Sequence, residues 1–536
     1  MRLLLGIDLG TSGLKAVVFD LDGNPLGKGL TANEYVTGPA GWAEQDPRMW
    51  WAGCCKAILS ALAESRAHPG NIAGIGVCGF HHIPVFLNAE GEPTRPSIVT
   101  HDQRLGDSLE DLRRSGILDQ VVGLSGSRVM TGHFPTIYHY LLKNDQGALE
   151  EARWILLAKD YLRFKLTGKI GTEACDATGT NLIAMPGQEW SESLCQLLQV
   201  PLEKLPPIGA SSQVFGCVTQ QAAQATGLQA GTPVVYGGGD SHCALVGLGV
   251  IGSGEVGMLL GTNSTLRASF GSFVPDLEHS VWAQQHVVPG TYTVSASSMA
   301  GSSVLSWYKK TCFAATAESV PLRCASGIAI LRRAGWEDPR SQDQEATYHE
   351  LESLAAGVPP GCDGLLFHPY LFGERSPFNN PKARGAFLAV THGHHQGHFV
   401  RSILEGVAFC IANCFETVHA IANERGEPIR TVRIADSGGT RLRLWRQIIT
   451  DALPAPLAGS PGGFPLEVVC VEEPGCLGAA LLAGVGVGQY EGISSAVEQT
   501  VRVGSQIVPD MAVSALYQER RTLFNAAYRA LESILY

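Results

Sequence analysis

GIDLGTSGLKAVVFD, residues 6–20, is the stretch of this chain that decides the fold. The apolar run Leu3–Asp8 predicts a strand, the small residues Gly10–Gly13 a tight turn, and Lys15–Phe19 a second strand. A further turn at Asp22–Pro25 follows directly. The chain therefore opens with a meander of antiparallel strands.

The same pattern returns in the middle of the chain. Leu260-Gly261-Thr262-Asn263-Ser264 echoes the turn Leu9–Ser12 after about 250 residues, a spacing too long for a solenoid repeat. Predicted strands at 255–260 and 265–270 flank this second turn. The repeat predicts two similar domains, at residues 1–247 and 248–536.

Helical and strand patterns alternate along both predicted domains. An Asp46-Pro47 start signal predicts a helix over residues 46–66. Further helices are expected around 134–168, 397–425 and 442–451, and buried strands at 72–78, 232–236, 431–435 and 466–471. Such alternation is typical of an α/β fold with helices packed on sheets.

Composition limits the classes of function. The chain has 536 residues, 45% of them apolar, and a net charge of −11, which argues against nucleic acid as a main partner. The short apolar run before Asp8 is unlike a secretory signal, and we find no uncharged stretch long enough to span a membrane. We expect a cytoplasmic protein without a membrane partner, in which the 14 cysteines are reduced thiols.

The first turn has the residues of a phosphate site. Backbone N–H groups at Gly10, Thr11 and Ser12 can point at phosphate oxygens, with Lys15 adding charge. Asp8, at the end of the strand, can hold Mg²⁺ directly or through water. An ordinary hairpin is the alternative. The second turn, Gly261-Thr262, favours the phosphate interpretation, because two facing turns could clamp one triphosphate.

Asp240 follows a buried strand and three glycines, Gly237 to Gly239. Glycines let the backbone approach a ligand closely. A carboxylate is the usual acceptor of the hydroxyl proton in kinases. The alternative is that Asp240 caps a helix over residues 241–245.

Other patterns point elsewhere. Glycine runs at 74–79 and 247–252 match the dinucleotide fingerprint, but neither lies between a strand and a helix. No Walker motif is present. Four histidines at 392–398 could suggest a metal, but a polar loop before a helix accounts better for them. His81-His82 follows a buried strand, where a core histidine is the alternative to a functional one.

Taken together, these motifs resemble the FGGY family of carbohydrate kinases along essentially the whole chain. The resemblance is carried by GIDLGTSGLKAVVFD, GWAEQDPRMWW, AKDYLRFKLTG, GGGD, GERSPFNNPKARGAF, SGGTRLRLWRQ and GCLGAALLAG. It implies two actin-like (ASKHA, ribonuclease H-like) domains with ATP and a sugar in the cleft between them. It further implies roles for residues of this chain: Asp240 as catalytic base, Asp8 near Mg²⁺, Gly261, Thr262, Gly439 and Thr440 around the nucleotide, and His81, His82, Asp102 and Arg104 toward the sugar.

The wording of several motifs is similar to the xylulokinase members of that family, which implies D-xylulose as substrate and D-xylulose 5-phosphate as product. Departures at Phe80, His81, Thr100, His101 and Thr136 bear on the sugar. A gluconokinase or another pentulose or polyol kinase is therefore the alternative. From other classes, an actin-like ATPase or a silent sugar-binding regulator would share the two turns. Related kinases suggest a homodimer.

Overall fold

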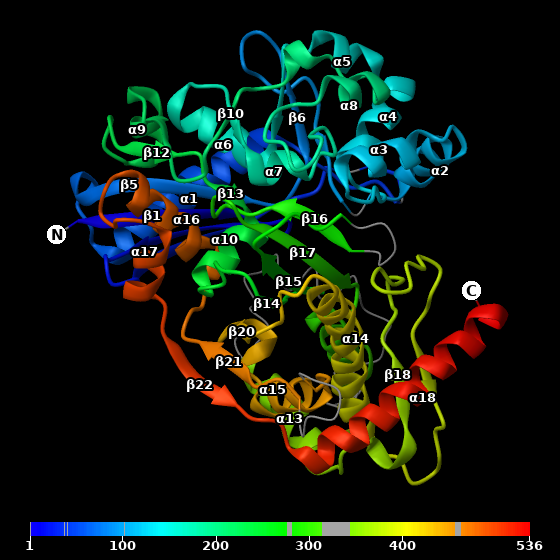
Figure 1. The fold of residues 1–536 in the computed structure, drawn as a ribbon. Coiled ribbons are helices and arrows are strands. Elements are labelled where there is room, and N and C mark those ends of the chain that lie inside the picture. The colour runs from blue at the N-terminus through cyan, green and yellow to red at the C-terminus, as the bar shows by residue number, and fades with distance from the viewer. Residues whose placement is uncertain are drawn as a thin grey trace, which may run out of the picture.

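Two seven-stranded sheets organise the molecule, one in each half of the chain (Figure 1). The structure is a computed structural model and describes residues 2–36, 38–39, 41–100, 102–275, 281–313, 344–455 and 463–535. The first half lies at the top of Figure 1 and the second half at the bottom, with helices α10 and α16 between them.

The first sheet has the predicted meander at its centre. The order is β11-β12-β5-β1-β2-β3, and β13 also pairs with β5. β1 runs antiparallel to β2 and parallel to β5, with Asp8 opposite Lys15. The strands are β1 (Leu3–Leu9), β2 (Gly13–Phe19), β3 (Pro25–Ala32), β5 (Ile72–Gly79), β11 (Val214–Cys217), β12 (Pro233–Val235) and β13 (Gly238–Gly239).

The second sheet repeats this arrangement. Its order is β16-β17-β15-β14-β20-β21-β22, and β14 runs antiparallel to β15 but parallel to β20. The strands are β14 (Glu255–Leu260), β15 (Ser264–Phe270), β16 (Trp282–Gln285), β17 (Tyr292–Ser298), β20 (Thr431–Ala435), β21 (Leu466–Val469) and β22 (Val503–Ile507). The fold is therefore the expected two-domain actin-like α/β fold, and the echo of the two turns reflects equivalent hairpins.

Helices cover both sheets. In the first half they are α1 (Pro47–Ser65), α2 (Gly106–Arg114), α3 (Ile117–Ser125), α4 (Phe134–Asn144), α5 (Gln146–Glu151), α6 (Ala158–Thr167), α7 (Ala174–Thr178), α8 (Glu192–Leu197), α9 (Gln220–Thr226) and α10 (Asp240–Gly247). In the second half they are α11 (Ser302–Tyr308), α13 (Gln344–Ala356), α14 (Gln396–Glu424), α15 (Arg443–Ala452), α16 (Pro474–Gly486), α17 (Ile493–Thr500) and α18 (Met511–Leu535).

Short elements complete the chain. The small strands are β4 (Glu44–Gln45), β6 (Pro84–Leu87), β7 (Ser97–Ile98), β8 (Trp154–Leu157), β9 (Thr172–Glu173), β10 (Ile208–Gly209), β18 (Leu366–His368) and β19 (Ala386–Leu388). The short helical turns are η1 (Pro69–Asn71), η2 (Gln103–Leu105), η3 (Leu202–Lys204), η4 (Lys309–Phe313), η6 (Cys362–Gly364) and η7 (Gly438–Arg441). The expectation of helix around 134–168 is confirmed by α4, α5 and α6 but was wrong at β8, because Trp154–Leu157 pairs with β6, a partner distant in the sequence.

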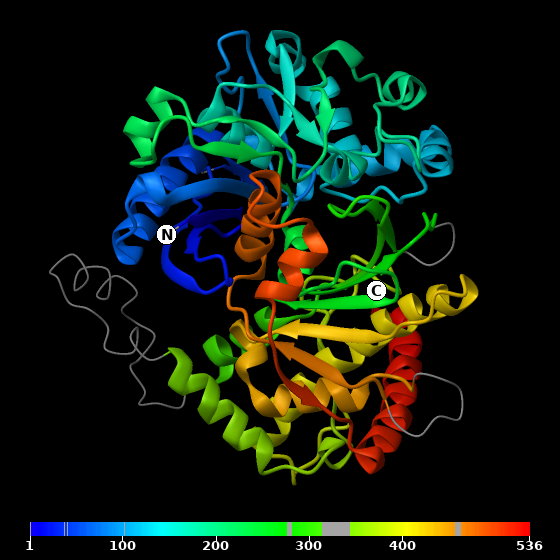
Figure 2. The ribbon, with the colours of Figure 1, turned by 60° about the vertical axis from the view of Figure 1, so that its left-hand side comes forward.

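Helix α16 crosses from the second half to the first. It packs on β1 and β5, and its neighbour across the junction is α10. Three glycines allow the contact: a Cβ at Gly6 would overlap Cys476, one at Gly76 would overlap Ala479, and one at Gly478 would overlap Cys243. In Figure 2 this helix, in orange, lies against the blue strands of the first sheet. The two halves therefore share a packed junction.

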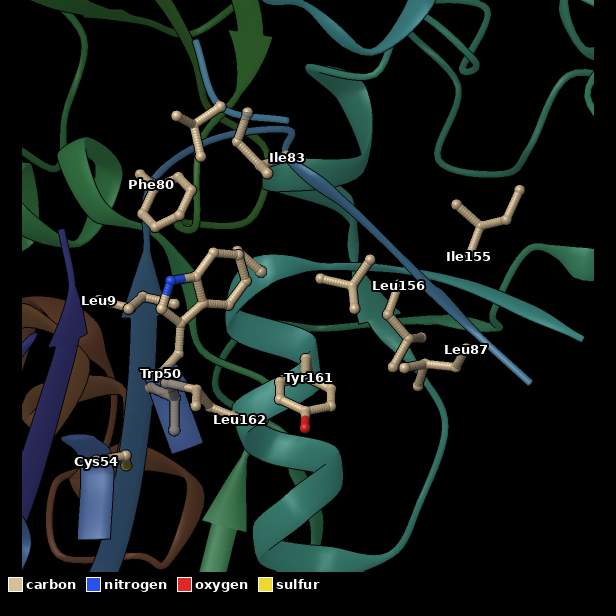
Figure 3. Close-up of a cluster of buried hydrophobic side chains, with 14 of the residues drawn as sticks. Leu9, Trp50, Cys54, Phe80, Ile83, Leu87, Ile155, Leu156, Tyr161 and Leu162 are labelled. Atoms are coloured by element: carbon tan, nitrogen blue, oxygen red, sulfur yellow. The ribbon is translucent and has the colours of Figure 1, made fainter. Parts of the chain in front are cut away.

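The core of the first half surrounds Trp50. Figure 3 shows its indole among Leu9, Phe80, Tyr161 and Leu162. The rings of Trp50 and Phe80 meet edge to face at 5.4 Å. In the second half, α14 is long and apolar enough to cross a membrane, but 78% of its most apolar stretch is buried inside the protein. Its apolarity is that of a core helix.

Candidate active site

A cavity of about 310 Å³ lies where the two sheets meet. Strand β1 supplies Asp8, β2 supplies Lys15, and the start of α10 supplies Asp240. From the second half, Gly261 and Thr440 complete the wall. The structure thus gathers predicted residues from both halves. Gly10, Thr11, Ser12 and Thr262 belong to the two turns beside this cavity and do not line it.

Asp240 stands at the first position of α10, after the glycine strand β13. Its Oδ1 accepts a hydrogen bond from the backbone N–H of Ser241 at 2.5 Å. Burial and the nearby Asp8 carboxylate raise the pKa of Asp240 to about 7. The N-cap of α10 is Gly239 and its cap has no side-chain hydrogen bond, so the capping alternative for Asp240 was wrong. Asp240 instead lines the cavity, with a pKa suited to a general base.

Asp8 is a buried carboxylate with an unused oxygen. Its Oδ1 has no hydrogen-bond partner among the described residues. Burial raises the pKa of Asp8, and Lys15 partly offsets this. Glu473 is held at 2.5 Å by Lys15 and lines the same cavity. An unpaired carboxylate oxygen on a residue that lines a cavity suits Mg²⁺, so the residues present fit a magnesium ion.

A second cavity of about 420 Å³ adjoins the first and shares Leu260 and Gly261 with it. Apolar and aromatic side chains and the glycines of η7 dominate its wall, which is typical of a nucleoside pocket. Its lining is Leu260, Gly261, Ser302, Leu305, Tyr348, His349, Gly438, Gly439, Arg441, Leu442 and Trp445. A Cβ at Gly439 would lie 2.5 Å from Ser302 Oγ and 3.0 Å from the Trp445 ring, so a side chain there would crowd this wall.

Thr440 has a structural task within η7. Its Oγ1 lies 2.6 Å from the carbonyl oxygen of Ala435 and 2.5 Å from that of Ser437, so its single proton can be donated to either. The side chain therefore holds the turn in shape, and only the backbone around it is free to face a nucleotide.

His81 and His82 contact Asp176 in the first half of the chain. His81 Nδ1 lies 3.3 Å from Asp176 Oδ1, and the backbone N–H of His82 donates to the same oxygen at 3.1 Å. Lys159 binds the other oxygen at 3.1 Å. Burial opposes ionisation, but Lys159 and the histidines hold the pKa of Asp176 well below its usual range.

The donor atoms of His81, His82 and Asp176 lie within 4.8 Å of one another, a spacing that a metal ion could bridge. Lys159, however, also contacts Asp160 at 2.8 Å and Glu173 at 3.2 Å, and all four side chains are fully buried. A cation already balances Asp176. We therefore interpret the group as a hydrogen-bonded network.

Unsatisfied polar atoms gather beyond His82. His82 has a left-handed backbone, with φ of 57°. Its Nδ1 lies 3.4 Å from Asp176 Oδ1, whereas both ring nitrogens of His133 and Gln284 Nε2 are buried without a hydrogen-bond partner among the described residues. The His133 ring stacks on Trp282 at 4.3 Å. Buried donors and acceptors next to an apolar ring are what a polyhydroxy ligand needs.

Asp102 and Arg104 form an ion-pair network with Glu44. Asp102 accepts from the Ala43 N–H and pairs with Arg104, both at 2.7 Å. Arg104 also binds Glu44 at 2.7 Å. The next residue, Gln45, donates to the Thr11 carbonyl at 2.9 Å. Gln45 thus connects this segment to the first glycine turn, and the described ion pairs of Asp102 and Arg104 do not include Asp240.

Several other predicted positions can be placed. Phe80 packs in the core (Figure 3), and the Thr136 hydroxyl donates to the His133 carbonyl. His395 caps α14, as expected for a polar loop before a helix. His101 lies outside the described residues.

The sequence did not identify the residues that contact Asp176, His81 and Asp240. Lys159 and Glu173 lie in segments that the hydrophobic pattern assigns to the core. Only their charges distinguish these two residues from the core residues around them. Ser241, His242 and Arg267 also escaped notice. His242 and Arg267 come together because α10 and β15 meet, which no local pattern shows.

Comparisons with known proteins agree with this geometry. Two family models match, described as the N-terminal and C-terminal domains of the FGGY family of carbohydrate kinases, over residues 3–247 and 257–487. The chain is 28% identical to a xylulose kinase of Escherichia coli (strain K12), covering 98% of this chain and 99% of that one. It is 26% identical to an autoinducer-2 kinase of Escherichia coli (strain K12 / DH10B), covering 98% and 94%.

A solved structure of a xylulose kinase from Rhodospirillum rubrum superposes with a TM-score of 0.82 at 26% identity, covering all of both chains. Fold and comparisons together define a phosphotransferase with two actin-like halves. The chain belongs to the FGGY family of carbohydrate kinases and is a sugar kinase. Kinases of this family use ATP as the phosphate donor.

Proposed function

We propose that this sugar kinase transfers the γ-phosphoryl group of ATP to a primary hydroxyl of D-xylulose, giving D-xylulose 5-phosphate and ADP. The observation that supports this proposal is the position of Asp240 on the wall of a cavity that residues of both halves line. The names of the two xylulose kinases above support the sugar. A cytoplasmic location and a homodimer stay predictions from the sequence.

In this proposal Asp240 accepts the proton of the attacking hydroxyl. The pKa of Asp240, raised to about 7, gives a carboxylate basic enough to share that proton late in the step. Gly261 and the backbone of η7 hold the nucleotide, and Lys15 adds positive charge beside the phosphates.

Asp8 would hold Mg²⁺, with Glu473 close by. When bound, the ion neutralises charge on the phosphate oxygens. Asp8 offers one oxygen that no described residue uses.

For the sugar, His133 and Gln284 supply unsatisfied nitrogen atoms beside the His82 ring. Gly179 leaves room for them, because a Cβ there would overlap the His82 ring and lie 2.6 Å from Gln284 Nε2. Hydroxyl groups of an extended ketose could satisfy these atoms while a terminal hydroxyl reaches Asp240.

The test is a coupled ADP-release assay with D-xylulose, L-xylulose, D-ribulose, D-gluconate, glycerol and erythritol. Selective turnover of D-xylulose is expected. Selective turnover of another compound would keep the mechanism and replace the substrate. ADP release that no sugar stimulates would contradict the proposal and favour an actin-like ATPase or a sugar-binding regulator.

The role of Asp240 is tested separately by Asp240→Asn. We expect kcat to fall at least ~10²-fold because the general base is lost, with ADP affinity retained. Isothermal titration with ADP serves as the folding control. A near-normal kcat would exclude Asp240 as the base.

A further inference from the structure

Gln284 on β16 is a buried amide that the protein binds at one end. Only 2% of this residue is exposed. Its Oε1 accepts a hydrogen bond from Arg267 Nη1 at 2.8 Å. Its Nε2 has no hydrogen-bond partner among the residues that the structure describes. A buried donor without a partner costs free energy, so this nitrogen is available to a ligand that brings an acceptor.

Arg267 determines which end of the amide is available. A guanidinium can only donate, so the amide oxygen of Gln284 has to face it and the amide nitrogen has to point away. Arg267 stays charged near neutral pH, although burial lowers its pKa to about 10. Its Nη1 also lies 2.8 Å from His242 Nε2, which helps to hold the guanidinium in place. Gln284 therefore offers N–H donors to a ligand.

The amide nitrogen lies near residues that contact the proposed base. A Cβ at Gly179 would overlap the His82 ring and lie 2.6 Å from Gln284 Nε2, so the ring and the amide approach the same point. His82 follows His81, whose Nε2 lies 3.4 Å from Asp240 Oδ1. A ligand that contacts both Asp240 and Gln284 therefore has to extend past these two histidines, as an open-chain sugar can.

The face of β16 that carries Gln284 borders a cavity. Side chains alternate along a strand, so Trp282 and Gln284 lie on one face. Trp282 lines a narrow cavity together with Ser295, which is opposite it on β17. His133 stacks on Trp282, and burial lowers the pKa of His133 well below its usual range. The neutral His133 ring has one donor and one acceptor, which suits a hydroxyl, whereas Gln284 Nε2 needs an acceptor.

The proposed substrate carries a group that only accepts. A 2-ketopentose closes into a ring through its C5 hydroxyl, so this hydroxyl is free for phosphorylation only in the open-chain form. That form has a C2 carbonyl, which accepts hydrogen bonds and has no proton to donate. A carbonyl bound to Gln284 satisfies the amide nitrogen, whereas a hydroxyl at the same point would bury an O–H that needs a further acceptor.

We propose that Gln284 makes this kinase selective for the open-chain keto form of its sugar by donating from Nε2 to the carbonyl oxygen. The inference rests on the proposed phosphorylation of a ketopentose. Gln284 is then a specificity-determining residue at the end of the sugar opposite the attacking hydroxyl. Arg267 is a positioning residue, because it acts on the sugar through the orientation of this amide.

Two substitutions of Gln284 test this role. The substrates to compare are D-xylulose and the polyols formed by reducing its carbonyl, xylitol and D-arabitol, and wild type should prefer the ketose. Gln284→Met keeps the side-chain length without the N–H, so we expect kcat/KM for D-xylulose to fall about 10- to 100-fold, mainly through KM. The values for the polyols should change less. Gln284→Glu should lower the preference further, because its free oxygen repels a carbonyl and accepts from a hydroxyl.

The matched control is Gln285→Met, the same change on the opposite face of β16. Gln285 Nε2 donates to the Gly187 carbonyl at 2.6 Å, so this variant also loses a buried hydrogen bond. Its ratio of kcat/KM for D-xylulose over the polyols should equal that of wild type. Equal losses for ketose and polyols in Gln284→Met would show a structural role and overturn the inference, as would the same change of ratio in the control.

Binding measurements provide a readout independent of turnover. Isothermal titration with ADP should give the same affinity in all variants, which reports correct folding. In the presence of ADP, Gln284→Met should bind D-xylulose about 10- to 100-fold more weakly than wild type. Unchanged binding would contradict the inference. A wild type that uses xylitol or D-arabitol as well as D-xylulose would overturn this inference alone, whereas a wild type without sugar-dependent ADP release would overturn the proposed function.

Discussion

At the scale of single residues, the environment of Asp240 couples activity to stability. The native pKa is about 7, above the ordinary Asp value of 3.8. Between these values the unfolded chain releases a proton that the native protein keeps. Ionised Asp240 therefore costs stability, and this cost grows as pH rises from 3.8 to about 7.

We accordingly expect Asp240→Asn to raise Tm above neutral pH, because it removes a carboxylate that the site disfavours. Near the ordinary Asp pKa the two proteins should melt alike, because wild-type Asp240 is then protonated. Scanning calorimetry at several pH values measures the difference. In wild type, kcat/KM should rise as Asp240 ionises near pH 7. A Tm difference that shrinks with rising pH would contradict the sign.

Residue types alone identified part of this site. Asp8, Lys15, Asp240 and Gly261 were predicted because each follows or opens a tight turn, and all line the cavity. His133 and Gln284 could not be predicted, because their unpaired atoms are recognisable only when β16 and α4 are placed against His82. Asp102 was predicted toward the sugar, but its carboxylate accepts the Ala43 N–H and pairs with Arg104.

At the scale of elements, the contact between α10 and α16 depends on glycine. We expect Gly478→Ala to lower the free energy of unfolding by at least ~2 kcal/mol, because the new Cβ would overlap the carbonyl oxygen of Cys243. Chemical denaturation measures this value.

The matched control is Gly106→Ala at the exposed start of α2, where nothing lies within 4 Å of a new Cβ. This change should be neutral or stabilise by up to about 1 kcal/mol, because alanine favours helix. Equal effects of the two substitutions would show that helix propensity, and not close packing, governs position 478.

Elements were predictable where the pattern is local. The hairpins at 3–19 and 255–270 and the helix α14 follow from alternation and apolar length. Strand β8 was missed because Trp154–Leu157 is a short apolar run, which fits a helix or a strand until its partner β6 is known.

At the scale of the whole molecule, residues of both halves line the cavity. We therefore expect bound ligands to determine whether the two halves close on each other. Asp8 and Lys15 line the cavity from the first half, and Gly261 and Ser437 line it from the second. Contacts that need both halves favour the closed form when sugar and nucleotide are present.

Small-angle X-ray scattering tests this expectation. A chain of 536 residues has a typical radius of gyration of about 24 Å when compact. Sugar with a non-hydrolysable ATP analogue should lower the measured radius, and either ligand alone should lower it less. An unchanged radius with both bound would show a cleft that is already closed.

The crossing of α16 also sets an order of events during synthesis. Strands β1 and β5 leave the ribosome early, but the helix that covers them begins only at Pro474. At ordinary translation speeds the interval is on the order of tens of seconds. During that time the narrow face lined by Gly6 and Gly76 has no cover. The nascent first half must stay soluble without its last helix, so a cell producing this enzyme has to shield an unfinished sheet until the chain is nearly complete.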